Sequence, residues 1–189
     1  MIRFTCEKSM LMAGLNITSR AVAQKSALSS LEGIFCYAGY GLRLTGYNME
    51  TAITYEIEAE VTEAGSCILP SRLFGDIIRR VPEGPVTVIV DENYKVSVRA
   101  GRASFTISAE NAEDYPELPD VSEGRKIFVP QKVLKDLISS TIFATAENKG
   151  RPIHTGVKFE VEENSISAIA VDGYRLARKT YHTPEPTGR

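Results

Sequence analysis

The sequence predicts an α+β protein built from repeated strand-helix-strand-strand-strand units. The first observation is a phrase of eleven residues that occurs twice, as ILPSRLFGDII at 68–78 and as FVPQKVLKDLI at 128–138. Both copies have a proline at the third position, where it suits the first turn of a helix. The second observation is that stretches with period-2 alternation, typical of half-buried strands, follow both copies and also precede the first.

The first unit, residues 1–62, has the same order of elements but lacks a close copy of the repeated phrase. Its predicted elements are a strand at 2–7, a helix over 9–23, and strands at 33–39, 42–48 and 51–61. In the last strand, apolar side chains alternate with threonine and glutamate, which predicts one buried and one acidic face.

The second unit, residues 63–112, contains the first copy of the phrase. Its predicted elements are a strand at 67–69, a helix over 71–81, and strands at 85–92, 94–100 and 103–109. We expect units one and two to pair into one domain, with two helices on one side of antiparallel sheets.

A third unit follows a linker. Residues 113–124 are acidic, contain two prolines and show no periodicity, which predicts a linker. The predicted elements of the third unit, 125–189, are a strand at 126–129, a helix over 131–146, and strands at 155–163, 165–172 and 174–181. This half-domain has no partner within the chain.

Composition excludes several classes of protein. The 189 residues are 43% hydrophobic and 24% charged, and no apolar run approaches the roughly 20 residues that cross a bilayer. The N-terminal MIRFTCEK lacks the apolar core of a signal peptide, which predicts a cytoplasmic protein. Cys6, Cys36 and Cys67 form no CxxC motif, so we interpret them as small buried hydrophobic residues.

The sequence gives little support for a catalytic site or a metal-binding site. His154 and His182 are the only histidines, and neither has a carboxylate or cysteine at ligand spacing. Asp172 lies in VDGYR, where an aspartate is more often a turn residue than a catalyst. We therefore expect neither an enzyme nor a cofactor or metal site.

Basic charge is concentrated in the predicted helices. The chain has a net charge of −2, yet the segments 8–25, 70–80 and 131–151 together carry +7. At helical spacing, the inward-facing residues are Leu73, Phe74, Ile77, Ile78 and Val81 in helix two, and Val133, Leu134, Leu137 and Ile138 in helix three. The outward-facing ones are Arg72, Arg79, Lys132, Asp136 and Ser139.

Such basic faces, if the units pack side by side, would form one positive surface suited to the phosphates of duplex DNA, without sequence preference. The plainer alternative is a set of solvated helices. No aromatic residue accompanies the cations, which argues against a single-strand binding platform.

Several motifs resemble the beta subunit of bacterial DNA polymerase III, the sliding clamp. They are ILPSRLFGDIIRRVPEGPV, GRASFTISAENAEDYPELP, RPIHTGVKFE and AVDGYRLA, and the similarity runs from residue 1 to about 182. The resemblance implies the sliding-clamp fold, in which two chains form a ring around duplex DNA with helices inside and sheets outside. It also implies a processivity factor that is not an enzyme.

The resemblance implies specific DNA contacts. Lys25 falls where the family has a basic contact after the first helix, and Asn148 and Arg151 lie in the loop after the third helix. Together with the assignments from the helix faces, the expected DNA-binding residues are Arg20, Lys25, Arg72, Arg79, Lys132, Lys135, Asn148 and Arg151.

The family also has a pocket for short linear peptides of DNA polymerase III, the clamp loader and repair proteins. The part carried over is His154, Val171, Asp172, Gly173, Tyr174, Arg175 and Leu176. His154 stands where a leucine is usual. It is either a harmless peripheral substitution or a pocket residue that makes peptide affinity depend on pH.

The chain stops after three half-units where the family has six, so we interpret it as a truncated gene product or an expressed fragment. An incomplete domain exposes apolar faces and a strand edge. We therefore expect a homo-oligomer in which residues 125–189 of two chains pair. The alternative function is a peptide-docking scaffold that no longer encircles DNA.

Overall fold

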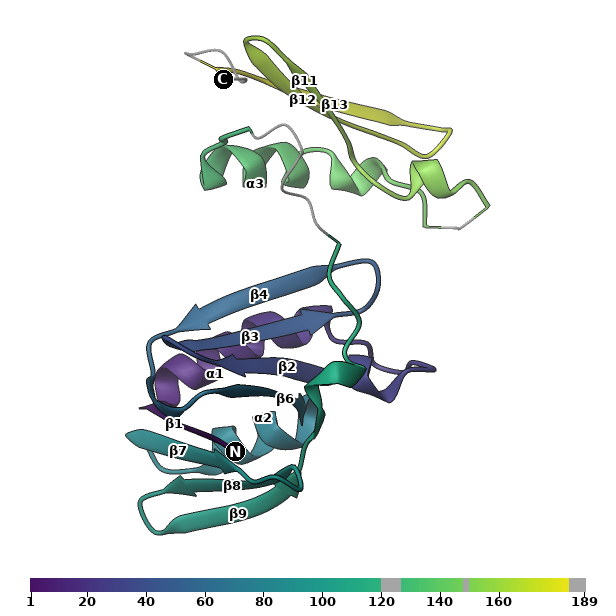
Figure 1. The fold of residues 1–189 in the computed structure, drawn as a ribbon. Coiled ribbons are helices and arrows are strands. Elements are labelled where there is room, and N and C mark those ends of the chain that lie inside the picture. Colours follow the sequence, from purple (N-terminus) through teal and green to yellow (C-terminus); the bar gives the residue numbers. More distant parts are fainter. Residues whose placement is uncertain (120–126, 148–149, 184–189) are drawn as a thin grey trace. The chain divides into compact units, whose positions relative to one another are not determined.

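Short antiparallel strands with alternating burial make up most of the chain, as the period-2 pattern predicts (Figure 1). The structure is a computed structural model that describes residues 1–119, 127–147 and 150–183. The chain divides into two larger units, Met1–Pro119 and Asp120–Arg189, which are called the first and the second unit from here on. The first contains the repeats predicted at 1–62 and 63–112, and the second contains the repeat predicted at 125–189.

The first unit contains two similar halves. The elements of its first half are β1 (Ile2–Glu7), α1 (Lys8–Thr18), β2 (Gly33–Ala38), β3 (Leu42–Tyr47), β4 (Ala52–Ile57) and β5 (Glu60–Glu63). Those of its second half are β6 (Gly65–Pro70), α2 (Ser71–Arg80), β7 (Pro85–Val90), β8 (Lys95–Ala100), β9 (Ala103–Ser108) and β10 (Glu110–Asn111). Short 3-10 turns occur at Ser19–Ala21, Ser29–Glu32 and Ala112–Asp114.

The two halves exchange their opening strands. One sheet has the order β5-β1-β7-β8-β9, and the other has the order β10-β6-β2-β3-β4. The strand that begins each half therefore lies in the sheet of the other half. The two helices contact each other and lie on the same side of the strands (Figure 1).

One continuous core lies between these sheets and helices. Phe4, Leu11, Leu44 and Phe74 are among its fully buried members, and they come from β1, α1, β3 and α2. The three cysteines are free and buried. Cys36 and Cys67 face each other across β2 and β6, and the hydrogen bond with Cys67, followed by burial, raises the pKa of Cys36.

Four details of the first unit differ from the prediction. The helix expected over 9–23 ends at Thr18. The strand expected at 51–61 is two strands, β4 and β5, which pair in different sheets. Leu73, expected to face inward, is 50% exposed. Tyr115, inside the expected linker, packs its ring against Phe35 in a tilted arrangement with the ring centroids 5.2 Å apart.

The second unit repeats the order of one half. Its elements are α3 (Gln131–Ser139), β11 (Lys158–Glu162), β12 (Ser165–Val171) and β13 (Leu176–His182), with 3-10 turns at Ile142–Ala144 and Pro152–His154. The strands form one antiparallel sheet in the order β11-β12-β13. Its buried hydrophobic cluster is Leu137, Ile166 and Ala168.

This unit also corrects several expectations. The helix predicted to reach residue 146 ends at Ser139, and the Thr141 hydroxyl then donates to the Leu137 carbonyl at 2.8 Å. The strand predicted at 126–129 is absent from its described part, 127–129. Leu134, predicted to face inward, is 39% exposed. No helix in the described ranges is both long and apolar enough to span a membrane.

Candidate nucleic-acid interface

The end of α1 is held tightly against the sheet, and this positions the first basic residue that follows it. The Thr18 hydroxyl donates to the Gly14 carbonyl at 2.8 Å and is buried. A Cβ atom at Gly46 on β3 would lie 2.1 Å from the Thr18 carbonyl oxygen, so only glycine fits there. The chain then turns through Ser19–Ala21 and leaves Arg20 exposed.

Helix α2 buries one face and exposes a basic one. Phe74, Ile77 and Ile78 are buried, as the apolar stripe predicts. Arg79 and Arg80 are exposed in the last turn, where cations interact favourably with the helix dipole. Asp76 pairs with Arg79 at 2.8 Å, on the same helix.

A groove of about 540 Å³ runs between α1 with its exit and the exposed side of α2. Two of the predicted DNA contacts, Arg72 and Arg79, line it together. Its other polar lining residues are Asn16, Ser19, Gln24, Glu32, Ser71 and Asp76. Asn16, Ser19, Gln24 and Ser71 offer hydrogen-bond donors beside the two guanidinium groups, which suits phosphate oxygens. The carboxylates of Glu32 and Asp76 offset part of the positive charge of the groove.

The cations near the helices differ in how far they are neutralised. Among the described residues, Arg20, Lys25 and Arg72 form no ion pair, and all three are exposed. Lys8 binds Glu83 at 2.7 Å, and its side chain is only 12% exposed. The positive charge counted for the first helix segment is therefore smaller at the surface than the sequence suggests.

The outer side of the strands carries acidic charge. On β4, Thr54 and Glu56 are exposed and alternate with the apolar residues of the inner face. Glu58 and Glu60 continue the exposed acidic series toward β5. Arg43 partly offsets it by pairing with Glu56 at 2.9 Å. Within the first unit, the helix side is thus basic and the strand side acidic.

The second unit exposes its own cations. Lys132 and Lys135 are exposed on α3, and Arg151 is exposed just before the turn Pro152–His154. Asp136 on the same helix binds Lys179 of β13 at 3.3 Å. Asn148, the remaining predicted DNA contact, lies outside the described residues.

The VDGYR segment forms a tight turn between β12 and β13. The Asp172 carboxylate accepts hydrogen bonds from the Tyr174 and Arg175 amides at 3.0 Å and from the Arg175 Nε at 2.8 Å. These bonds, with the two amides first, lower the pKa of Asp172. Gly173 has a φ of 97°, which favours glycine. Asp172 therefore acts as a turn residue.

This turn leaves apolar groups at the surface. Tyr174 is fully exposed and Leu176 is 66% exposed, whereas Val171 is half-buried. The Arg175 guanidinium lies 5.9 Å from the centre of the Phe143 ring, a cation–π arrangement. Of the predicted peptide-pocket residues of this turn, residues 173–176 thus form one exposed segment, whereas Val171 and Asp172 are half-buried.

His154 is half-buried, and its backbone is fixed on both sides. Its amide donates to the Arg151 carbonyl at 2.9 Å, and its carbonyl accepts from the Ala146 amide at 2.9 Å. Its neighbour Ile153 is 86% exposed. His154 therefore sits in a turn that presents a large apolar side chain to the solvent.

Several surface residues near these sites were missing from the sequence prediction. Asn16 and Ser19 line the groove, and their i, i+3 spacing beside Arg20 is the signal that could have identified them. Ile153 and Phe143 had no comparable signal, because an apolar residue in a loop is as compatible with burial as with exposure. Within the described ranges, no group of three potential metal ligands occurs.

Comparison with known families accounts for both units. Residues 2–119 match the family described as DNA polymerase III beta subunit, N-terminal domain. Residues 128–188 match the family described as DNA polymerase III beta subunit, central domain.

Individual relatives agree with these matches. The beta sliding clamp of Halalkalibacterium halodurans is 31% identical over 187 residues, covering 94% of this chain and 49% of the relative. That of Bacillus subtilis is 30% identical over 197 residues, covering 100% of this chain and 52% of the relative. The chain thus spans about half the length of these curated relatives.

Solved structures share the fold. The crystal structure of the Bacillus subtilis DNA polymerase sliding clamp superimposes with a TM-score of 0.94 at 30% identity, covering 100% of this chain and 52% of that one. A putative DNA polymerase III beta subunit from Eubacterium rectale gives 0.94 at 29% identity, covering 98% and 51%. The predicted sliding-clamp fold is confirmed, and the chain belongs to the DNA polymerase III beta subunit family.

Proposed function

We propose that this chain is a DNA polymerase processivity factor that holds duplex DNA against its helices without reading sequence. The single observation that carries the proposal is the groove between α1 and α2, where the exposed Arg72 lies beside Arg79 and the donor side chains of Asn16, Ser19, Gln24 and Ser71. Phosphate contacts from such groups attract any duplex.

The division of charge within the first unit supports this proposal. Arg20, Lys25 and Arg72 are exposed and unneutralised by described residues, whereas the outer face of β4 is acidic. A basic inner side attracts DNA, and an acidic outer side repels it, so bound DNA is directed to one surface. Contacts limited to the backbone permit movement along the duplex.

The test compares two charge reversals of equal size. Arg72→Glu alters the groove, and Arg99→Glu alters an exposed position on β8 that alternates with the buried Val98 and Ala100. Binding to a labelled duplex is measured by fluorescence anisotropy over a range of salt concentrations. We expect Arg72→Glu to weaken binding and to reduce the slope of log K against log salt by about 1.

Arg99→Glu should leave both the affinity and the slope unchanged. Equal losses in the two variants would contradict a contact at the helices. A second test asks whether the assembled protein encircles DNA. Protein that encircles DNA should stay on a circular duplex and leave it once the duplex is cut, whereas protein bound only to the surface should bind both forms alike.

A second candidate function is the docking of short linear peptides, as expected for a scaffold that tethers DNA polymerase III, the clamp loader or repair proteins. The exposed segment Tyr174 to Leu176 favours it, because hydrogen bonds to Asp172 fix its backbone while its apolar groups face the solvent. Preorganised apolar groups of this kind bind peptides at low entropic cost.

Leu176→Asp tests this second function. We expect it to weaken the binding of a polymerase-derived peptide at least about tenfold, since an apolar contact is replaced by a charge. Isothermal titration calorimetry measures the affinity. Phe105→Asp, at a 38% exposed position of β9, is the matched control; an equal loss there would refute docking at this turn.

A further inference from the structure

The outer face of the sheet β10-β6-β2-β3-β4, turned away from α1 and α2 (Figure 1), carries two adjacent rows of side chains. In each row, a residue of β2 faces one of β3, which in turn faces one of β4. The rows are Phe35, Thr45 and Thr54, and Tyr37, Arg43 and Glu56. Successive outward residues of a strand lie about 6.7 Å apart, so this is also the step from one row to the next.

The first row borders a hollow of about 550 Å³, called the Phe35 hollow here. Its walls are the Phe35 ring and the segment 112–118 that packs against it, with Leu118 42% exposed. Tyr115 fixes this segment, because its hydroxyl donates to the Thr45 carbonyl at 3.2 Å and its ring lies against Phe35. The mostly apolar walls suit an apolar side chain.

The second row borders a hollow of about 340 Å³, called the tyrosine hollow here, which combines aromatic rings with carboxylates. Tyr37 lines it and is 45% exposed, and Tyr40 lines it and is fully exposed. A Cβ atom at Gly39 would lie 2.7 Å from the Tyr37 ring, so that ring rests on the Gly39 backbone. Glu56 and Glu58 line the same hollow. Aromatic faces beside carboxylates favour a guanidinium or an ammonium group.

The charges of the two hollows also favour a cation. Arg43 lines both of them, and its Nε and Nη2 bind the Glu56 Oε1 at 3.2 and 2.9 Å. Glu58 in the tyrosine hollow and Glu117 in the Phe35 hollow are exposed, and neither forms an ion pair with any described residue. One arginine therefore stands against three glutamates, and that arginine is already neutralised.

We propose that this face is a docking site for an extended, cationic peptide segment of a partner protein. An arginine or lysine side chain enters the tyrosine hollow, and an apolar side chain two positions away enters the Phe35 hollow. In an extended peptide, side chains two positions apart point to the same side and lie about 6.7 Å from each other. This spacing matches the step between the two rows of the sheet.

The docking site lies apart from the two sites described above. The groove of Arg72 and Arg79 lies along α1 and α2, on the opposite side of the sheet. The exposed turn from Tyr174 to Leu176 belongs to the second unit. A peptide at the outer face therefore leaves the basic groove free.

Peptide titration of the ¹⁵N-labelled full chain, followed by NMR, tests the ligand chemistry. The probe is acetyl-Leu-Ser-Arg-Ser-amide, and two matched probes replace its arginine with glutamate or its leucine with serine. We expect saturable shifts of the amides of β2, β3 and β4 with the first probe. Each replacement should weaken binding at least about fivefold, because it removes the occupant of one hollow. Equal affinities for the arginine and glutamate probes would overturn the proposal.

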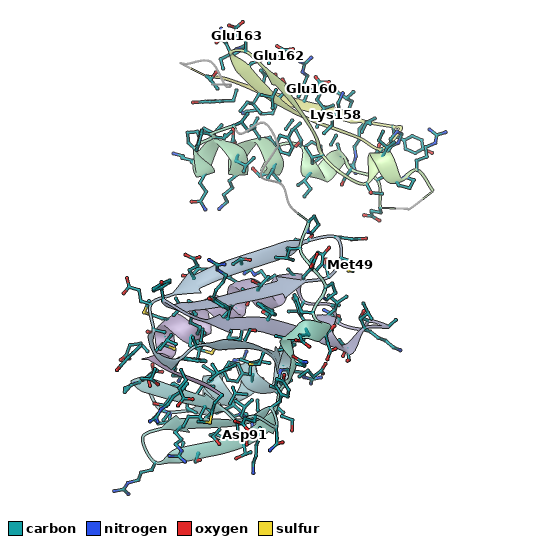
Figure 2. The ribbon with its side chains drawn as sticks, in the orientation of Figure 1. Met49, Asp91, Lys158, Glu160, Glu162 and Glu163 are labelled. Atoms are coloured by element: carbon teal, nitrogen blue, oxygen red, sulfur yellow. The ribbon has the colours of Figure 1, made fainter. Side chains whose placement is uncertain are left out.

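Charge reversal tests the site itself. Glu58→Lys should weaken binding of the arginine probe at least about tenfold, because it turns an attraction within the tyrosine hollow into a repulsion. Tyr37→Ala should weaken it about fivefold through the loss of an aromatic wall. The matched control is Glu92→Lys, an exposed position next to Asp91 in the turn between β7 and β8 of the other sheet (Figure 2). It should bind as the wild type does.

Equal losses in Glu58→Lys and Glu92→Lys would show attraction to the net charge alone and would overturn the site. Shifts centred on residues 174–176, or displacement of the probe by a DNA duplex, would place the peptide elsewhere and would also overturn it. Circular dichroism confirms that each variant is folded. Because Glu58 and Tyr37 are exposed, their replacement leaves the core intact.

Discussion

Tyr115 joins the segment after β10 to the sheet of β2 and β3. Its hydroxyl donates to the Thr45 carbonyl at 3.2 Å, and its ring packs against Phe35 in a tilted arrangement. Burial raises the pKa of Tyr115 to about 12. An unfolded tyrosine has a pKa of about 10, so the folded state keeps a proton that the unfolded state loses between these values.

This shift predicts how stability changes with pH. The contribution of Tyr115 is fully present below pH 10 and is lost as the pH rises toward 12. Tyr115→Phe should lower the free energy of unfolding by about 1 kcal/mol at pH 7. It should also make the alkaline loss of stability less steep than in the wild type, as measured by urea denaturation. Parallel alkaline curves would contradict the shift.

Single residues were predicted well where local spacing decides their place and poorly where a distant partner does. Phe74 and Ile78 are buried, as their spacing on the helix indicates. Lys8 was counted as a surface charge, but it pairs with Glu83, 75 positions away. No local pattern contains that information, because the two residues meet only through the pairing of β1 with β7.

At the scale of elements, close contact between α1 and β3 depends on one glycine. Gly46→Ala would place a Cβ atom 2.1 Å from the Thr18 carbonyl oxygen, which belongs to the backbone and cannot rotate away. We expect a loss of about 1–3 kcal/mol in the free energy of unfolding. Chemical denaturation measures it.

Gly75→Ala on α2 is the matched control. A Cβ atom there meets no atom within 4 Å, and alanine favours a helix over glycine by about 1 kcal/mol. This variant should therefore be more stable than the wild type. Equal effects of the two substitutions would show that the contact at Gly46 does not limit the packing.

The order and type of elements followed from sequence, but their pairing did not. Alternation predicted β2, β3, β7, β8 and β9 close to their observed bounds. It also predicted one strand at 51–61, because period 2 continues from Ile57 to Val61 across the break between β4 and β5. The exchange of β1 and β6 between halves involves residues far apart in sequence, which periodicity does not report.

At the scale of the whole molecule, the two units differ in the size of their cores. The first unit has a large cluster drawn from both sheets and both helices, whereas the buried cluster of the second is Leu137, Ile166 and Ala168. We therefore expect two thermal unfolding transitions by calorimetry, with the second unit melting first.

The upper transition should belong to the first unit, because both of its sheets draw all their strands from residues 1–119. A single transition would contradict this expectation.

The exchange of opening strands also makes the two halves of the first unit depend on each other. A polypeptide with only one of these halves would lack a strand that the other half supplies, so neither half could complete its sheet alone.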